Sequence, residues 1–174
     1  MATTKHTLVA LVEDKPGVLN RVASLFRRRG FNIDSITVGP SETTNVSRMT
    51  IVVDGTTLSV EQVRKQLDKL IETVKVSDIT GESIVERELA LIKVKASPAN
   101  RSEIIQMVDI FRANIVDVSA ESLTIEVTGD EDKMDSLLNL LKPFGIKEAC
   151  RTGRIAMTRG SASESARRQA DQDI

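Results

Sequence analysis

Aromatic and metal-binding side chains are scarce in this sequence. Four Phe, no Tyr and no Trp occur among 174 residues, so the core must be built from Val, Ile, Leu and Met, and base stacking has few side chains to use. The single cysteine, Cys150, excludes an intrachain disulfide framework and a multi-cysteine zinc site. The single histidine, His6, has no ligand-type residues at metal-binding spacing around it, so we expect an ordinary strand-end histidine and no metal site.

Charge of one sign and long apolar runs are also lacking. The formal net charge is -1 at pH 7, which creates no long-range field toward phosphate backbones or anionic membranes. No apolar run approaches the roughly 20 residues of a membrane span, and the first residues hold no apolar signal core. With 40% hydrophobic and 28% charged residues the composition is ordinary for a globular protein. We therefore expect a soluble, cytoplasmic protein with neither nucleic acid nor membrane as partner.

The periodicity of the first 80 residues alternates between strand and helix. Apolar residues at strand spacing predict strands over residues 6–13, 32–38, 48–53 and 74–79. Helical spacing predicts a helix from Val18 to just before Gly30, and Ser59 to Gln62 is typical of a capping box that opens a second helix. The first strand is apolar on both faces, which favours the centre of a sheet. This order is that of the ferredoxin-like split unit.

The same order begins again after the connector at residues 81–83. Strands are predicted over residues 89–94, 115–118, 123–127 and 146–157, with helices opening at Ser97 and at Asp130. Only the order of strands and helices repeats, and the amino-acid sequence itself does not. We predict an α+β fold of two ferredoxin-like βαββαβ domains in tandem, residues 1–80 and 81–159, each with an antiparallel sheet covered by helices on one face. The polar residues 160–174 predict a disordered tail.

Signatures of catalysis are absent from the sequence. It contains no G-x-G-x-x-G, no P-loop and no G-x-S-x-G, which disfavours dinucleotide binding, phosphate cradling and serine-hydrolase chemistry. Cys150 has no histidine close in sequence to serve as a base, so a small core or edge residue is the better interpretation. The carboxylates lie where solvated helix faces would place them. We therefore predict no catalytic residue.

One loop has the composition of a binding site. Residues 14–19 combine a Pro at a helix start, a Gly that permits close backbone approach, and free N–H groups at the positive end of the helix dipole. Such a terminus can accept the carboxylate of a small molecule, but it can also be only a well-made helix start, and the residues alone leave both readings open. Asn32 begins the next strand and joins the Asp14 loop across a dimer interface if that strand is an exposed edge. The amide of Asn32 and the carboxylate of Asp14 are suitable partners for the ammonium group of an amino acid.

These motifs carry a family resemblance. LVEDKPGVLNRV over residues 11–22 and FRRRGFNIDSI over residues 26–36 closely resemble the ACT domain at the start of acetolactate synthase small subunits. The likeness extends from about Lys5 to Arg159. Further matching stretches are SRMTI at 47–51, QLDKL at 66–70, VEREL at 85–89, NRSEI at 100–104, IFRA at 110–113 and RTG at 151–153.

The resemblance implies a non-catalytic regulatory subunit in branched-chain amino acid biosynthesis. It implies a homodimer formed through ACT domains, activation of the catalytic large subunit, and feedback inhibition by valine or by the related leucine or isoleucine. Thiamine diphosphate, Mg and FAD would belong to the large subunit, with no cofactor in this chain. The implied effector-binding residues are Asp14, Pro16, Gly17, Val18, Leu19, Asn20, Asn32 and Ile33. Val18, Leu19 and Ile33 would form the apolar wall, and Asp14 stands where the family often has Asn.

Two rival functions remain open at this stage. One is a free-standing ACT-type amino-acid sensor that acts on a transcription or signalling partner, which co-purification with a thiamine-dependent enzyme would exclude. The other is a small-molecule enzyme on a ferredoxin-like scaffold, which turnover by the isolated chain would support. The second domain lacks the Pro-Gly loop, since its helix opens at Ser97-Pro98-Ala99-Asn100. We therefore expect it to have a structural role or to contact the large subunit.

Overall fold

The chain folds into two compact units with one antiparallel sheet each, so the predicted α+β class is confirmed. A computed structural model describes residues 4–160. The first unit contains the residues up to Val85 together with the segment that starts at Arg154, and the second contains Glu86–Gly153. The expected boundary at residue 159 therefore differs, because residues 154–159 return to the first unit. The tail expected over residues 160–174 lies outside the described residues except for Gly160.

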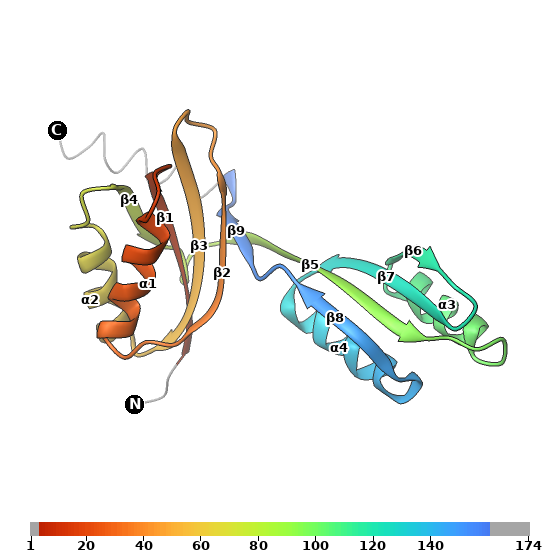
Figure 1. Ribbon diagram of the computed structural model, residues 1–174. Helices are drawn as coiled ribbons and strands as arrows, with labels where there is room; N and C mark the ends of the chain where they lie inside the picture. Colours follow the sequence, from red (N-terminus) through yellow and green to blue (C-terminus); the bar gives the residue numbers. More distant parts are fainter. Residues whose placement is uncertain (1–3, 161–174) are drawn as a thin grey trace. The chain divides into compact units, whose positions relative to one another are not determined.

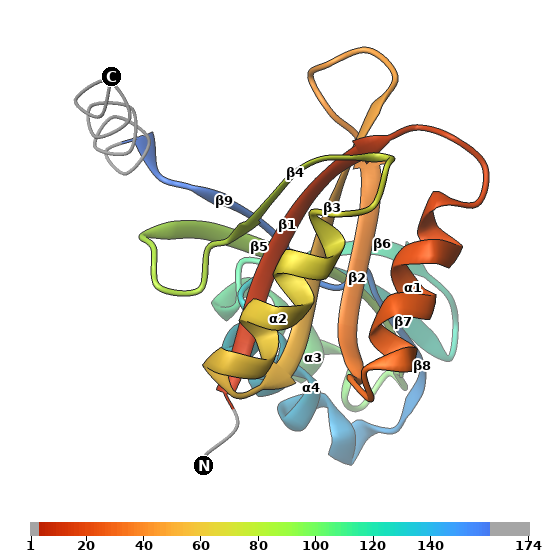
Figure 2. The same cartoon turned by 90° about the vertical axis from the view of Figure 1, so that its left-hand side faces the viewer.

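The first unit has the predicted order of elements. These are β1 (Thr4–Glu13), α1 (Val18–Arg28), β2 (Ile33–Pro40), β3 (Val46–Gly55), α2 (Thr57–Leu67) and β4 (Thr73–Asp78). The four strands form an antiparallel sheet in the order β2-β3-β1-β4, which makes β2 and β4 its edges. Both helices cover one face of this sheet (Figures 1 and 2).

Alternation along β1 builds the core under these helices. Leu8, Ala10 and Val12 point toward α1 and α2 and are 0 to 1% exposed. Phe26 of α1 meets Phe31 edge to face, with ring centroids 6.4 Å apart. α2 begins at Thr57, earlier than expected, because Thr56 is its N-cap and Ser59 is the third helical residue that completes the capping box.

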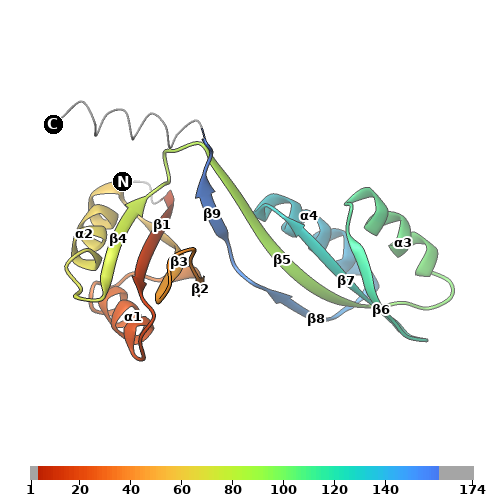
Figure 3. The ribbon, with the colours of Figure 1, turned by 90° about the horizontal axis from the view of Figure 1, so that it is seen from above.

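Residues 154–159 cover part of the opposite face of the first sheet. β9 (Ile155–Thr158) belongs to residues 154–159, a segment that we call the strap, and it lies on the side away from the helices (Figures 1 and 3). Ala156 of the strap forms a small buried cluster with Val9 and Ile79. β1 is therefore covered on both faces, as its apolar pattern predicts.

The second unit repeats the fold. Its elements are β5 (Ile84–Lys95), α3 (Arg101–Ile110), β6 (Asn114–Val118), β7 (Ser122–Gly129), α4 (Glu131–Leu141), the 3-10 turn η1 (Lys142–Phe144) and β8 (Ile146–Arg151). The sheet order is β6-β7-β5-β8, and both helices lie on one face. Asp130 caps α4, accepting a hydrogen bond from the Lys133 N–H.

Two sequence expectations in this half are wrong in detail. The single strand expected over residues 146–157 is two strands, β8 and β9, because Gly153 with φ 82° breaks the extended backbone between them. The helix expected to open at Ser97 begins at Arg101. The residues before it form a turn in which Asn100 Oδ1 accepts the Ser97 N–H at 2.7 Å.

Candidate functional site

The loop between β1 and α1 is held in place by its own backbone. The N–H of Asp14 donates to the carbonyl oxygen of Asn45 at 2.8 Å, and the N–H of Glu13 donates to that of Glu72 at 2.8 Å. The N–H of Lys15 bonds back to Glu13 at 3.0 Å. The loop is thus anchored to the β2–β3 connection on one side and to the start of β4 on the other.

Gly17 gives this loop an open, sharply turned helix start. Its φ of 87° lies in the left-handed region, where a side chain is strained by about 1–2 kcal/mol. A Cβ built on Gly17 would meet no atom within 4 Å, so the space over the backbone is empty. A small molecule can therefore approach the loop closely.

The N-terminus of α1 is uncapped within the described part of the chain. Gly17 supplies no side-chain hydrogen bond, and the first intrahelical bond runs from the Arg21 N–H to the Gly17 carbonyl at 3.1 Å. The Leu19 and Asn20 N–H groups precede that bond and have no cap. Side chains cap α2 and α4, whereas α3, like α1, has no side-chain cap. With no acidic residue in its first turn, α1 keeps its positive dipole end uncompensated.

Most charged side chains around the loop form ion pairs, and the carboxylate of Asp14 lies beside these pairs. Lys15 forms an ion pair with Glu13 at 2.6 Å, and Arg21 pairs with Glu72. The hydrogen bond that Lys15 donates to Glu13 raises the pKa of Lys15. Asp14 is an exposed carboxylate next to these pairs. A positive helix end beside a carboxylate matches the two charges of a free α-amino acid.

The expected apolar wall is only partly in place. Val18 is 6% exposed and belongs to the core beneath α1, so its side chain is not available to a ligand. Leu19 is 48% exposed beside the loop, and Pro16 and Asn20 are exposed as well. Ile33 is half-buried and packs against the first core.

Asn32 and Ile33 lie at the other end of the unit. Ile33 pairs with Val53, at the end of the sheet where β1 begins, whereas the Asp14 loop follows the end of β1. The 11 residues of α1 separate the two places by roughly 16 Å along the helix axis. A single chain therefore brings residues 14–20 together but does not bring them to Asn32.

The other residues singled out from sequence form no catalytic arrangement. His6 is 4% exposed, and its Nδ1 lies 3.4 Å from an oxygen of Asp78. Cys150 is exposed on the edge strand β8, so it is an edge residue and not a core residue.

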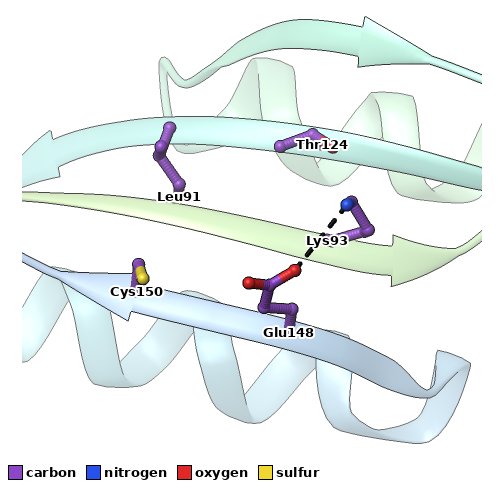
Figure 4. Close-up of a pocket in the computed structure, with 5 residues that line it drawn as sticks. All are labelled: Leu91, Lys93, Thr124, Glu148 and Cys150. Atoms are coloured by element: carbon purple, nitrogen blue, oxygen red, sulfur yellow. Dashed lines mark ion pairs between the residues drawn. The ribbon is translucent and has the colours of Figure 1, made fainter.

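The open face of the second sheet surrounds Cys150. Lys93 and Glu148 form an ion pair at 3.7 Å on this face, and Leu91 and Thr124 complete a shallow hollow (Figure 4). Within residues 4–160 no cluster of three His, Cys, Asp or Glu side chains has the geometry of a metal site. None of the helices described is long and apolar enough to cross a membrane.

Comparisons with known proteins identify the family. A family described as the AHAS small subunit-like ACT domain matches residues 8–75, and one described as the small subunit of acetolactate synthase matches residues 87–160. The probable acetolactate synthase small subunit of Archaeoglobus fulgidus is 63% identical over 157 residues, covering 90% of this chain and 98% of the relative. The chain belongs to the acetolactate synthase small-subunit family.

Further members agree in sequence and in structure. The acetolactate synthase small subunit of Mycobacterium bovis is 53% identical over 160 residues, which cover 92% of this chain and 95% of the relative. A crystal structure of the small subunit from Thermotoga maritima has a TM-score of 0.84 and 49% identity, covering 90% of this chain and 98% of that one. Family membership places the chain among the regulatory small subunits, as the sequence resemblance implies.

Sequence reasoning missed the residues that hold the loop. Asn45, with its positive φ of 61°, and Glu72 both act from distant parts of the chain. Asn followed by a strand pattern is a turn signal that could have pointed to Asn45. Nothing local marks Glu72 as the partner of Arg21, because their contact spans 51 residues.

Proposed function

We propose that this chain binds valine, or the closely related leucine or isoleucine, at the start of α1 and so regulates the catalytic large subunit of acetolactate synthase. The observation that carries the proposal is the uncapped, open helix start at Gly17 beside the exposed carboxylate of Asp14. In this proposal the chain activates the large subunit, and the bound amino acid inhibits the complex.

The chemistry of the loop suits an α-amino acid. The N–H groups of Leu19 and Asn20 receive the ligand carboxylate, and the helix dipole adds favourable charge. The Asp14 carboxylate holds the ligand ammonium on the outer side of the loop. Leu19, which is 48% exposed, offers apolar surface to an aliphatic side chain.

A second copy of the chain completes the site in this proposal. β2 is an edge strand, and two β2 strands paired across a two-fold axis run antiparallel. Pro40, at the end of β2, pairs with Ser47, next to the position where β1 leads into the Asp14 loop. Antiparallel pairing therefore places Asn32 at the start of one β2 near the Asp14 loop of the other copy. The amide of Asn32 and the side chain of Ile33 then close the site from the partner.

The reaction itself belongs to the large subunit. Thiamine diphosphate, Mg and FAD are assigned to that subunit, and the described part of this chain offers no metal cluster. α3 of the second unit also has no side-chain cap, but it lacks the Pro-Gly loop, its N-cap is Asn100, and Glu103 places a negative charge in its first turn. We assign the second unit a structural role or contact with the large subunit.

Mixed dimers test where the site lies. Gly17→Asp places a carboxylate over the loop that receives the ligand carboxylate, and Asn32→Ala removes the amide, so each variant alone is expected to lose valine binding in calorimetry. In a mixture, each hybrid dimer has one site built from two unchanged halves. About one wild-type site in four should return on random mixing.

The control is the mixture of each variant with itself. No recovery in the mixture, with hybrid dimers verified by mass, would show that the two residues do not meet across copies. Full valine binding by Gly17→Asp would exclude the loop as the site.

A further inference from the structure

The strap is bonded to the strand that begins at the proposed ligand site. Thr37 Oγ1 donates a hydrogen bond to the carbonyl oxygen of Arg154 at 2.9 Å, and the Arg154 N–H donates to Ser35 Oγ at 3.5 Å. Ser35 and Thr37 both lie on β2, two and four residues beyond Ile33. Any shift of β2 along or across the sheet therefore acts on the backbone of Arg154.

The rest of the strap is fixed to the centre of the same sheet. The Arg154 guanidinium donates to Thr7 Oγ1 of β1 at 3.3 Å, and Arg48 of β3 donates to the carbonyl oxygen of Ala156 at 2.8 Å. Ala156 is 6% exposed against Val9. The strap thus contacts the edge strand β2 and both central strands of the first sheet. A change in the position of β2 relative to β1 and β3 therefore alters the contacts of the strap.

One residue separates these bonds from the second unit. The Thr152 N–H donates to the carbonyl oxygen of Leu89 on β5 at 3.0 Å, and the Leu89 N–H donates to Thr152 Oγ1 at 3.1 Å. Between Thr152 and Arg154 stands only Gly153, so the connection is short. A displacement of Arg154 therefore reaches Thr152 through a single residue.

β8 transmits such a displacement into its own unit. Arg151, the last residue of β8, donates to Glu88 of β5 at 2.6 Å and to Asp135 of α4 at 2.8 Å. The end of β8 is therefore linked to the middle of the second sheet and to a helix packed on it.

We propose that the strap is the device that carries the regulatory signal from the ligand site to the second unit. The inference rests on the proposed function, since the ligand contacts the start of β2 there. The ligand binds more tightly to one position of β2, and the hydroxyls of Ser35 and Thr37 hold Arg154 differently in the two positions. Without these hydrogen bonds the ligand still binds, but its effect no longer reaches Thr152.

Thr37→Val tests the device because it keeps the shape of the side chain and removes the O–H donor. Thr37→Ser keeps the donor and is the matched control. The full-length variants are compared for valine affinity by calorimetry and for valine inhibition of acetolactate formation after reconstitution with the large subunit. Thr37→Val is expected to bind valine like the wild type, with an inhibitory coupling roughly 2- to 30-fold smaller. Thr37→Ser is expected to behave like the wild type in both measurements.

Hydrogen exchange in the free chain gives a second readout. Valine is expected to change the exchange rate of the Thr152 N–H in the wild type and in Thr37→Ser, but not in Thr37→Val. Normal inhibition of Thr37→Val, or equal losses of binding and inhibition, would overturn the strap mechanism alone. A wild-type chain that neither binds valine nor confers inhibition would overturn the proposed function and the strap mechanism together.

Discussion

At the residue scale, Glu61 shows how a local ion pair controls a titration. Arg64 donates two hydrogen bonds to Glu61, at 2.7 and 2.8 Å, within α2. The hydrogen bond from Arg64 lowers the pKa of Glu61 from 4.5 to about 2, and the nearby Lys65 adds a smaller effect. A lowered carboxyl pKa stabilises the folded chain above the unfolded value of 4.5, and this contribution is lost as the pH falls toward about 2.

We predict that Glu61 stays ionised at pH 3.5 at low salt. In Arg64→Gln its pKa should rise toward 4.5, because the largest cause of the shift is removed. Lys65→Gln is the control and should raise the pKa by less. NMR titration of the Glu61 carboxyl measures its pKa in the wild type and in both variants. Added salt should reduce the pKa difference between the wild type and Arg64→Gln, since the ion pair is on the surface. A wild-type midpoint near 4.5 would contradict this account.

Neighbouring residues of the candidate site differ in how far the sequence could specify them. Gly17 was predictable, because a Gly after Pro at a helix start indicates both a turn and an open backbone. The sequence could not predict that Val18 is buried and Leu19 exposed, since the two residues are both aliphatic and adjacent. Only the rotation of α1 on its sheet decides that Val18 is 6% and Leu19 48% exposed.

At the element scale, α4 depends on a cap that the sequence identifies. We predict that Asp130→Ala destabilises the second unit by about 0.5–2 kcal/mol, because the Lys133 N–H loses its acceptor at 2.9 Å. Asp130→Asn retains a side-chain oxygen and should cost less than half as much. Urea unfolding measures both, and equal losses in the two variants would argue against capping as the cause.

The periodicity of the sequence predicted which helices and strands form, but it did not always predict the residues at which they begin and end. Alternation and helical spacing predicted each α-helix and strand of both units, apart from the division of the last strand, but β5 begins at Ile84, five residues before the predicted Leu89, and the 3-10 turn η1 was not predicted. Residues 146–157 read as one strand because β8 and β9 are both extended and both pair with β5, and the pattern contains no information about where the strand is interrupted. The positive φ of Gly153 redirects the chain, and it becomes visible only with the tertiary contacts of the strap.

At the scale of the whole molecule, the proposal requires two copies to meet at β2. Val38 is 46% exposed on this edge strand. We predict that Val38→Lys weakens the dimer and reduces valine binding in parallel, because a buried ammonium at the interface is costly to desolvate. Sedimentation and calorimetry on the same samples check this.

Val118→Lys is the matched control for this prediction. Val118 is 61% exposed on β6, the edge strand of the second sheet, and the proposal assigns no interface to it. This variant should keep both the dimer and valine binding. A dimer that survives Val38→Lys with full valine binding would place the interface elsewhere.

The most direct test of the account is acetolactate formation by the cognate large subunit, measured with and without this chain and titrated with valine. We predict that the chain raises the rate and that valine then lowers it, whereas the large subunit alone does not respond to valine. No effect of the chain on either the rate or the valine response, with complex formation verified, would contradict the account and favour a free-standing amino-acid sensor.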